Sequence, residues 1–595
     1  MKEKICKGIL AAYFFIITVV YPLYAPGGYL RIGEVKYYFF RNVTLVTLAV
    51  LCAVVLLAAL VSRDREWIMT HYRQMSVTDW FAYGYCLVVM LSYLCSDYKE
   101  DALWGEEGWH MGVVSQIMFV LLYFFFSRCF CHRDGASATV AEYGAADGSI
   151  AAIEDRTADS SIVVAGCGTA DGSIAAVEDR AAGSSIAVAG DRAAGSSSTE
   201  VGRWLGLWLF TSAAVFLLGI CNRYSVYPIV MEGQTETFIS TLGNINWFCG
   251  YWSVTAPIGI MLYWCGRQGV TRVLAGAYSF LAMLSGVTQG SNSAYLVYLV
   301  MFPAIFILSL RDKKKLYRFL ELGMIFALAC QTGRLLQALP GFTYNYWNER
   351  PGESRGITGI LIDSDAAAVL LLLLTGCYLV VRLLDKGRYL RLEKVKRLRS
   401  ILIMAAVVGS LGIFWVLAGD GFVILRETGF VVESDGYLKV IPDDDWGNGR
   451  GATWNCGVNA YREMDLLHKI VGVGQDCFAD HIYDVPKLAE RMWDEFANLR
   501  LTNAHNEWLT ILINTGALGL LCYVGIYATA FVRFMKRAGK KPLLYACAMA
   551  LLAYTVHNMV SFQQILSTPY IFIVLGIGEG LAREDGDITG EQQIE

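Results

Sequence analysis

Residues 42–62 read NVTLVTLAVLCAVVLLAALVS, and none of these 21 side chains carries a charge. About 20 apolar residues in a helix span the roughly 30 Å hydrocarbon core of a bilayer. Backbone amides in lipid find no water to bond, so such a block forms a helix or a strand of a closed barrel. Because the block does not alternate with a period of two, it predicts a membrane-spanning helix.

Apolar blocks of this kind recur through the whole chain of 595 residues. Of these residues 55% are hydrophobic and 17% are charged, whereas soluble domains carry more charge. The blocks lie near residues 8–24, 42–62, 79–95, 111–127, 203–220, 244–265, 273–288, 294–310, 319–336, 366–384, 401–418, 508–532, 543–560 and 562–581. They predict an all-α fold, a polytopic transmembrane helix bundle of roughly 12–14 spans.

The charges of the connections between these blocks indicate the orientation. Short cytoplasmic connections carry an excess of Lys and Arg. If the N-terminus is cytoplasmic, the basic connections all fall inside, at 63–74, 266–272, 311–318, 385–399 and 533–541. The outside segments, such as 96–110 and 419–505, are acidic or mixed. We therefore expect a multi-pass protein of the plasma membrane with both termini cytoplasmic and a large extracytoplasmic loop that caps the bundle.

This orientation divides the chain into six parts. We predict N-terminal transmembrane helices over 1–127, a low-complexity insert over 128–202, further transmembrane helices over 203–418, an extracytoplasmic loop over 419–505, C-terminal transmembrane helices over 506–582 and a cytoplasmic tail over 583–595.

The insert contains an internal repeat. ADGSIAAIEDRTADSSIVVAG at 146–166 returns as ADGSIAAVEDRAAGSSIAVAG at 170–190, a period of 24 residues. Such a period is compatible with a stacked solenoid. The units lack large apolar side chains with which to bury a core, so we favour a disordered cytoplasmic linker and assign it no chemistry.

Three motifs follow one another between about residues 240 and 530. TLGNINWFCGYWSVTAPIGIML occupies 241–262, GRGATWNCGVNAYREMDLLHKIVGVGQDCF occupies 449–478, and NAHNEWLTILINTGALGLL occupies 503–521. The last has a His-Asn pair at the outer end of an expected helix, then an apolar stretch and Gly-x-x-Gly. In this order, on a chain of this topology, the motifs resemble the O-antigen ligase/polymerase family of lipid-linked polysaccharide ligases and polymerases, which are GT-C-like membrane glycosyltransferases.

The resemblance implies an enzyme of cell-surface polysaccharide biosynthesis. It would transfer a glycan from an isoprenoid pyrophosphate donor to an acceptor hydroxyl at the outer membrane face. The implied partners are that lipid-linked donor, a glycan or lipid acceptor and membrane lipid, with no nucleic acid. Neither a metal nor a cofactor is expected. The sequence leaves open whether the protein is a ligase or a polymerase.

The leaving group of such a transfer is already good, so the reaction needs a cation at the phosphates and a base at the acceptor hydroxyl. Arg450 suits the first role, because a guanidinium forks onto phosphate oxygens and stays charged. His505 suits the second, because imidazole is neutral near pH 7. We expect Trp454, Asn506, Glu507 and Asn246 to bind substrate beside them.

One position departs from the family's pattern. Asn292 stands where relatives often have an arginine, and Arg350 or Arg355 in the loop NERPGESRG (348–356) are candidates to replace it in binding the donor. Two rival functions remain. A transporter or flippase of lipid-linked oligosaccharides would show inverted repeats and charges near the bilayer midplane, and no similarity between the two halves is evident. The departure at Asn292 leaves a non-catalytic relative as the other alternative.

Overall fold

The computed structural model describes residues 2–62, 75–129, 200–266, 269–344, 356–387, 432–434, 437–441, 444–497 and 499–583. The span predicted at 401–418, nearly all of the repeat insert and tail, and both Arg350 and Arg355 lie outside the described residues.

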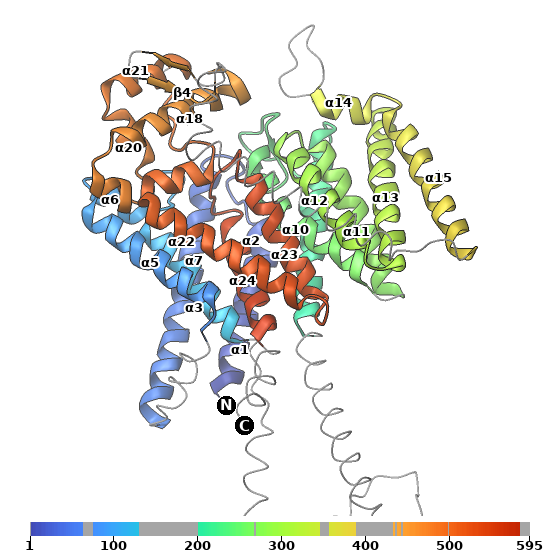
Figure 1. Cartoon of the computed structure of the whole chain (residues 1–595), viewed down its shortest axis with the longest axis horizontal. Coiled ribbons are helices and arrows are strands. Elements are labelled where there is room, and N and C mark those ends of the chain that lie inside the picture. The colour runs from blue at the N-terminus through green and yellow to red at the C-terminus, as the bar shows by residue number, and fades with distance from the viewer. Residues whose placement is uncertain are drawn as a thin grey trace, which may run out of the picture.

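The chain is helical nearly throughout its described part (Figure 1). The N-terminal helices are α1 (Lys2–Phe15), the π-helical turn η1 (Ile16–Val20), α2 (Tyr21–Leu23), α3 (Ile32–Ser62), α5 (Val77–Cys95), α6 (Lys99–Trp104) and α7 (Val113–Cys129). A helix over Glu200–Arg223 follows. Next come α10 (Ile245–Cys265), α11 (Val270–Thr288), α12 (Ser293–Ser309), α13 (Lys313–Gln337), α14 (Gly356–Ile362) and α15 (Ala366–Lys386). The last three are α22 (Glu507–Arg537), α23 (Leu543–His557) and α24 (Thr568–Arg583).

Eight of the described helices are long and apolar enough to cross a membrane, and three further apolar helices are shorter. Each predicted apolar block that lies in the described residues overlaps a helix. The prediction of an all-α, polytopic membrane bundle is therefore confirmed.

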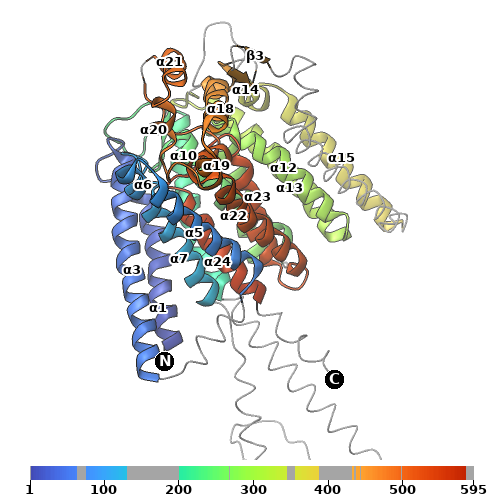
Figure 2. The same cartoon turned by 60° about the vertical axis from the view of Figure 1, so that its left-hand side comes forward.

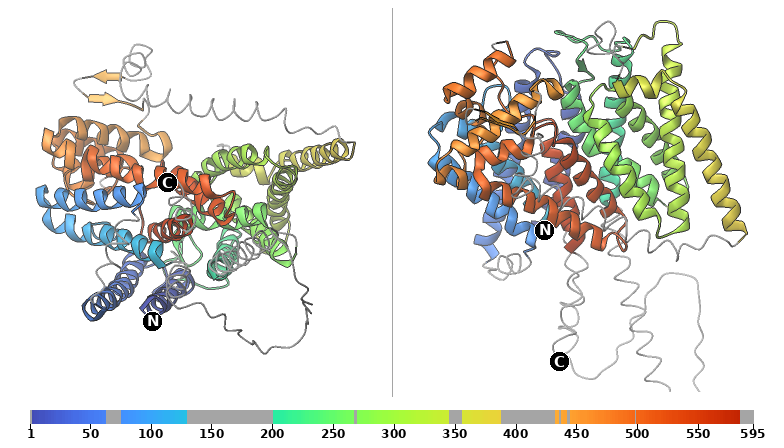
Figure 3. Two further views of the ribbon diagram at one scale, coloured as in Figure 1. Left: turned by 60° about the horizontal axis from the view of Figure 1, so that its bottom comes forward. Right: turned by 45° about the horizontal axis from the view of Figure 1, so that its top comes forward.

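The C-terminal helices lie in the middle of the bundle. In the left panel of Figure 3, α23 and α24 lie between the N-terminal helices and the group α10–α13. They pack directly on both neighbours, since α24 contacts α7 and α23 contacts α10 and α12. The ends of α24, α5 and α7 meet at one end of the bundle, where Arg583 donates to Asp79 at 2.6 Å and Arg128 lies 3.5 Å from the same carboxylate.

A small helical unit covers the opposite end (Figure 2). We call it the cap. It contains the antiparallel strands β3 (Val432–Ser434) and β4 (Tyr437–Lys439), then α18 (Trp446–Glu463), α19 (Leu466–Val471), α20 (Phe478–Tyr483) and α21 (Pro486–Glu495). Its own apolar core includes Phe478, Ile482 and Met492 and also takes in Ile513 of α22, so the cap is packed onto the bundle.

The span predicted at 508–532 contains a break. Gly516 has φ 68° and ψ −175° inside α22, a region that favours glycine. A Cβ atom there would lie 2.3 Å from the backbone carbonyl carbon of Ile470. Gly472 faces the same contact, because its Cβ would lie 2.2 Å from the Asn514 carbonyl oxygen. Two glycines of the quoted motifs thus allow the end of α19 to press against α22.

Candidate functional site

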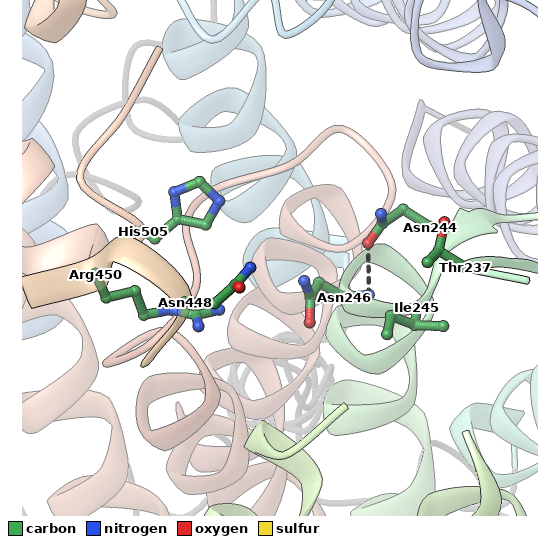
Figure 4. Close-up of a pocket in the computed structure, with 7 residues that line it drawn as sticks. All are labelled: Thr237, Asn244, Ile245, Asn246, Asn448, Arg450 and His505. Atoms are coloured by element: carbon green, nitrogen blue, oxygen red, sulfur yellow. Dashed lines mark hydrogen bonds between the residues drawn. The ribbon is translucent and has the colours of Figure 1, made fainter. Parts of the chain in front are cut away.

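A cavity of about 210 Å³ lies where the cap meets the bundle (Figure 4). Its lining comes from three segments: the start of α10 with the hairpin of β1 (Phe238–Ile239) and β2 (Gly243–Asn244), the start of α18, and the residues before α22. The lining residues are Thr237, Asn244, Ile245, Asn246, Asn448, Arg450 and His505. Three of the predicted site residues, Asn246, Arg450 and His505, therefore share one cavity.

Arg450 reaches the cavity because three residues before it adopt left-handed conformations. Gly447, Asn448 and Gly449 have φ of 67°, 65° and 81°, which turns the chain sharply before the regular part of α18. A Cβ atom on Gly449 would lie 2.4 Å from the Phe496 ring, so both the positive φ and this close contact favour glycine at this position. The run WGNGRG is thus an ordered turn that delivers a guanidinium.

The guanidinium of Arg450 is bound to backbone oxygens. Its Nε donates to the Val560 carbonyl at 3.1 Å and its Nη1 donates to the Gly447 carbonyl at 2.5 Å. No carboxylate among the described residues forms an ion pair with Arg450. Burial lowers the pKa of Arg450 from its ordinary value, but an arginine keeps its charge in proteins. The cavity therefore holds a cation whose charge is not neutralised by a described side chain.

His505 lies on the same side of the cavity as Arg450 (Figure 4), in a strained backbone conformation. Its φ is 48°, and its N–H donates to Asn503 Oδ1 at 3.0 Å. The preceding Ala504 carbonyl accepts from Trp454 Nε1 at 3.0 Å, which ties the segment to α18. The imidazole packs edge-on against Phe562, with ring centroids 5.1 Å apart.

The imidazole of His505 is neutral at physiological pH. Burial, and then the charge of Arg450, lower its pKa to about 4. No hydrogen bond links either ring nitrogen to another side chain or carbonyl in the part of the chain that the structure describes. A neutral ring has one nitrogen that accepts a proton, so His505 can act as a base toward a hydroxyl placed in the cavity.

The start of α10 contributes hydrogen-bond donors. Asn244 caps this helix, because its Oδ1 accepts from the Asn246 N–H at 2.9 Å. The Asn246 Oδ1 in turn accepts from Ser291 Oγ at 2.8 Å. Both amide oxygens are thus engaged by the protein, which leaves the amide N–H groups as donors. With Arg450 nearby and the positive end of the α10 dipole behind it, the cavity suits an anion.

The other predicted binding residues have different positions. Trp454, Asn506 and Glu507 do not line this cavity. Trp454 supports the chain before His505, and Asn506 caps α22 by accepting from the Leu509 N–H at 3.1 Å. Glu507 is buried and accepts from Tyr523 at 2.5 Å and from Tyr554 at 3.3 Å. The proximity of these three residues to Arg450 or His505 in the sequence did not indicate where their side chains point.

Sequence reasoning missed Thr237, Asn244, Ile245 and Asn448 as lining residues. Two of them carried a signal: Asn244 belongs to the same Gly-Asn-x-Asn motif as Asn246, and Asn448 lies between two glycines. An arginine from another helix contacts the residues just before position 292, because a Cβ atom on Gly290 would lie 3.1 Å from Nη2 of Arg223. Arg223 is buried and donates to the Thr288 carbonyl at 3.2 Å.

Residues 356–524 match the family model described as O-Antigen ligase. This match supports an O-antigen ligase/polymerase-like family. The matched segment includes Arg450, His505 and the cap, whereas Asn246 lies before it. No curated protein matches the chain. The match supports a role in polysaccharide biosynthesis and the lipid-linked glycan as the general kind of substrate.

Proposed function

We propose that the protein uses this cavity to transfer a glycan from an isoprenoid pyrophosphate to an acceptor hydroxyl. The observation that carries the proposal is the position of Arg450 and His505 on the walls of one cavity, an unneutralised cation beside a neutral base. The acceptor oxygen attacks the anomeric carbon, and the bond from that carbon to the pyrophosphate oxygen breaks. His505 takes the hydroxyl proton, and the lipid pyrophosphate leaves with the bonding electron pair.

Arg450 serves the leaving group in this proposal. Negative charge grows on the bridging phosphate oxygen as the bond breaks, and fixed donors in a site sheltered from water stabilise it strongly. The Asn246 amide and the start of α10 add donors on the facing wall. Because these groups supply the positive potential, we propose transfer without a metal ion.

We propose an apolar groove as the site for the lipid part of the donor. It has a volume of about 380 Å³ between α22 and α23. Its lining is Trp508, Val524, Tyr527, Ala528, Phe531, Leu551, Leu552 and Thr555. Trp508, at the start of α22, follows His505 by three residues in the sequence. In our proposal an isoprenoid chain in the groove starts at this end of α22.

The orientation of the bundle supports transfer at the outer face. The basic connections before α13 and after α22 lie at the end of the bundle opposite to the cap (Figure 1). Basic connections prefer the cytoplasm, which would place the cap and cavity outside. The cytoplasmic preference of these basic connections also supports our proposal that both termini are cytoplasmic.

The experiment is glycan transfer by purified protein in nanodiscs with a polyprenyl-pyrophosphate oligosaccharide as donor. Arg450→Ala and His505→Ala should each lower kcat/KM at least a hundredfold. The matched controls are Arg31→Ala, an exposed arginine of the α2–α3 connection, and His468→Ala on α19. Wild-type transfer by both site variants would refute the proposed site.

A further inference from the structure

A row of buried polar side chains leads from the cavity into the bundle. Ser291 Oγ donates to Asn246 Oδ1 at 2.8 Å, and the hydroxyl oxygens of Ser291 and Ser293 are 2.7 Å apart. Ser293 Oγ lies 3.1 Å from Nδ1 of His557. Ser291, Ser293 and His557 are exposed by only 4%, 6% and 1%. The row joins the first turn of α10, the α11–α12 connection, the first residue of α12 and the last residue of α23.

The protons of this row can be counted. An amide oxygen has no proton, so the Ser291 hydroxyl supplies the one in its bond to Asn246. Because a hydroxyl has a single proton, Ser293 must donate to Ser291. His557 must then carry a proton on Nδ1 and donate it to Ser293. The Ser293 hydroxyl can also donate to Cys249 Sγ, which lies 3.2 Å away. Sulfur is a weaker acceptor than a hydroxyl oxygen, so the count assigns the proton of Ser293 to Ser291.

The opposite arrangement reverses every bond in the row. If the Asn246 amide turned over, its N–H would donate to Ser291, and the chain would end on an unprotonated Nδ1 of His557. His557 would then carry its proton on Nε2. That nitrogen is buried and has no hydrogen-bond partner among the described residues. Orphaned buried N–H groups are rarer than orphaned acceptors, so the unreversed arrangement is favoured.

We propose that His557 is a positioning residue for the pyrophosphate site. Through Ser293 and Ser291 it holds the Asn246 amide with both N–H groups toward the cavity and with the oxygen turned away. Asn246 then presents two donors to a phosphate group on the wall that faces Arg450 (Figure 4). In the reversed state a carbonyl oxygen would face the phosphate and repel it. This inference rests on the proposed function, which places the pyrophosphate in this cavity.

The test is the affinity of the full-length protein in nanodiscs for inorganic pyrophosphate, measured by calorimetry. His557→Gln removes the donor at the Nδ1 position, whereas His557→Asn places an amide N–H near it. We expect His557→Gln and Ser291→Ala to weaken binding about tenfold, the value of one hydrogen bond to a charged group. The conservative variants His557→Asn and Ser291→Thr should keep an affinity close to that of the wild type. Ser279→Ala, which removes a buried hydroxyl bonded to Ala275 within α11, is the matched control.

A double-mutant cycle separates positioning from general damage. If His557 acts through Asn246, His557→Gln should weaken binding no further in an Asn246→Ala background. Additive losses, or wild-type affinity in both His557→Gln and Ser291→Ala, would overturn the inference. If Asn246→Ala and Arg450→Ala lose affinity while His557→Gln keeps it, the row fails and the pyrophosphate site stands. Wild-type affinity in Asn246→Ala and Arg450→Ala would reject both.

Discussion

The Nε of Arg450 donates to the carbonyl of Val560, 110 residues later in the chain, at 3.1 Å. Val560 belongs to the α23–α24 connection, which also supplies the Phe562 ring that packs against His505. One connection therefore contacts both residues to which we assign the chemistry. Its own position depends on Glu507, whose backbone N–H donates to the Asn558 carbonyl at 3.0 Å and whose side chain accepts from the Asn558 amide.

Replacing Glu507 should therefore destabilise the α23–α24 connection that contacts Arg450 and His505. Glu507→Leu leaves the buried polar groups of Tyr523, Tyr554 and Asn558 without their acceptor. We expect a loss of about 3 kcal/mol in stability, since each orphaned buried group costs about 1–3 kcal/mol. Thermal unfolding in nanodiscs measures this. Glu507→Gln keeps an acceptor and should be milder, and equal stability of the Leu variant and the wild type would contradict this reading.

Gly516 should tolerate no side chain. In Gly516→Ala the new Cβ would lie 2.3 Å from the Ile470 carbonyl carbon, and φ is 68°. Backbone cannot withdraw as a flexible side chain can, so we expect destabilisation of at least about 2 kcal/mol and loss of transfer. Gly539→Ala is the control, because no atom lies within 4 Å of the added Cβ. If the two variants unfold at the same temperature, Gly516 is not needed for the close contact between α19 and α22.

The acid limb of the pH profile should report His505. Its pKa of about 4 means that the base of the empty site is deprotonated at and above about pH 5. The value of kcat/KM, which follows the free enzyme, should stay constant from pH 8 to about 5 and fall below that. Initial rates at low donor concentration measure this profile. An acid limb centred near pH 6.5 would indicate an unperturbed histidine and a different environment.

The attachment of the cap to the α6–α7 connection, where Asp476 accepts from the N–H groups of Glu106 and Met111, should weaken as the pH rises. Burial raises the pKa of Glu106 to about 7 and that of Asp476 to about 8. Both values exceed those of unfolded carboxyls, about 4. The folded state therefore binds more protons between about pH 4 and 8, and stability falls as pH rises through this window. Arg500 lies 3.2 Å from Glu106 and offsets part of the loss.

Hydrogen exchange of residues 99–111 tests this dependence directly. Exchange should be faster at pH 8.5 than at pH 6 after correction for the intrinsic rate. Glu106→Gln should reduce the difference, because a neutral amide cannot lose a proton. Protection from exchange that increases with pH in the wild type would contradict the predicted fall of stability with rising pH.

Filling the groove between α22 and α23 should affect lipid recognition alone. Ala528→Trp places a large ring among Tyr527, Phe531 and Leu552. We expect KM for a polyprenyl-linked donor to rise about tenfold, while the affinity for inorganic pyrophosphate stays unchanged. Leu521→Trp, on an exposed position of the same helix outside the groove, is the control. An equal effect of both substitutions would show that the groove is not specific.

The sequence predicted the bundle because lipid restricts the backbone so strongly. Apolar blocks such as 42–62 have one way to satisfy their amides, so length and composition are sufficient. The chemical types of the site were also evident, since Arg450 and His505 belong to quoted motifs. Trp454, Asn506 and Glu507 were expected to bind substrate beside them, but none of the three lines this cavity. Side chains at successive helix positions point in different directions, so proximity in the chain does not fix which cavity a residue faces.

The amino-acid sequence by itself determined that this protein is a helical membrane bundle with a cation and an imidazole in one polar loop. Only the tertiary structure decided that Asn246, from a helix more than 200 residues earlier, faces them, and that Glu507 turns away into a tyrosine network. Helix formation in lipid is a local demand of the backbone. The walls of a cavity depend instead on which helix ends meet, and that follows from the packing of the whole bundle.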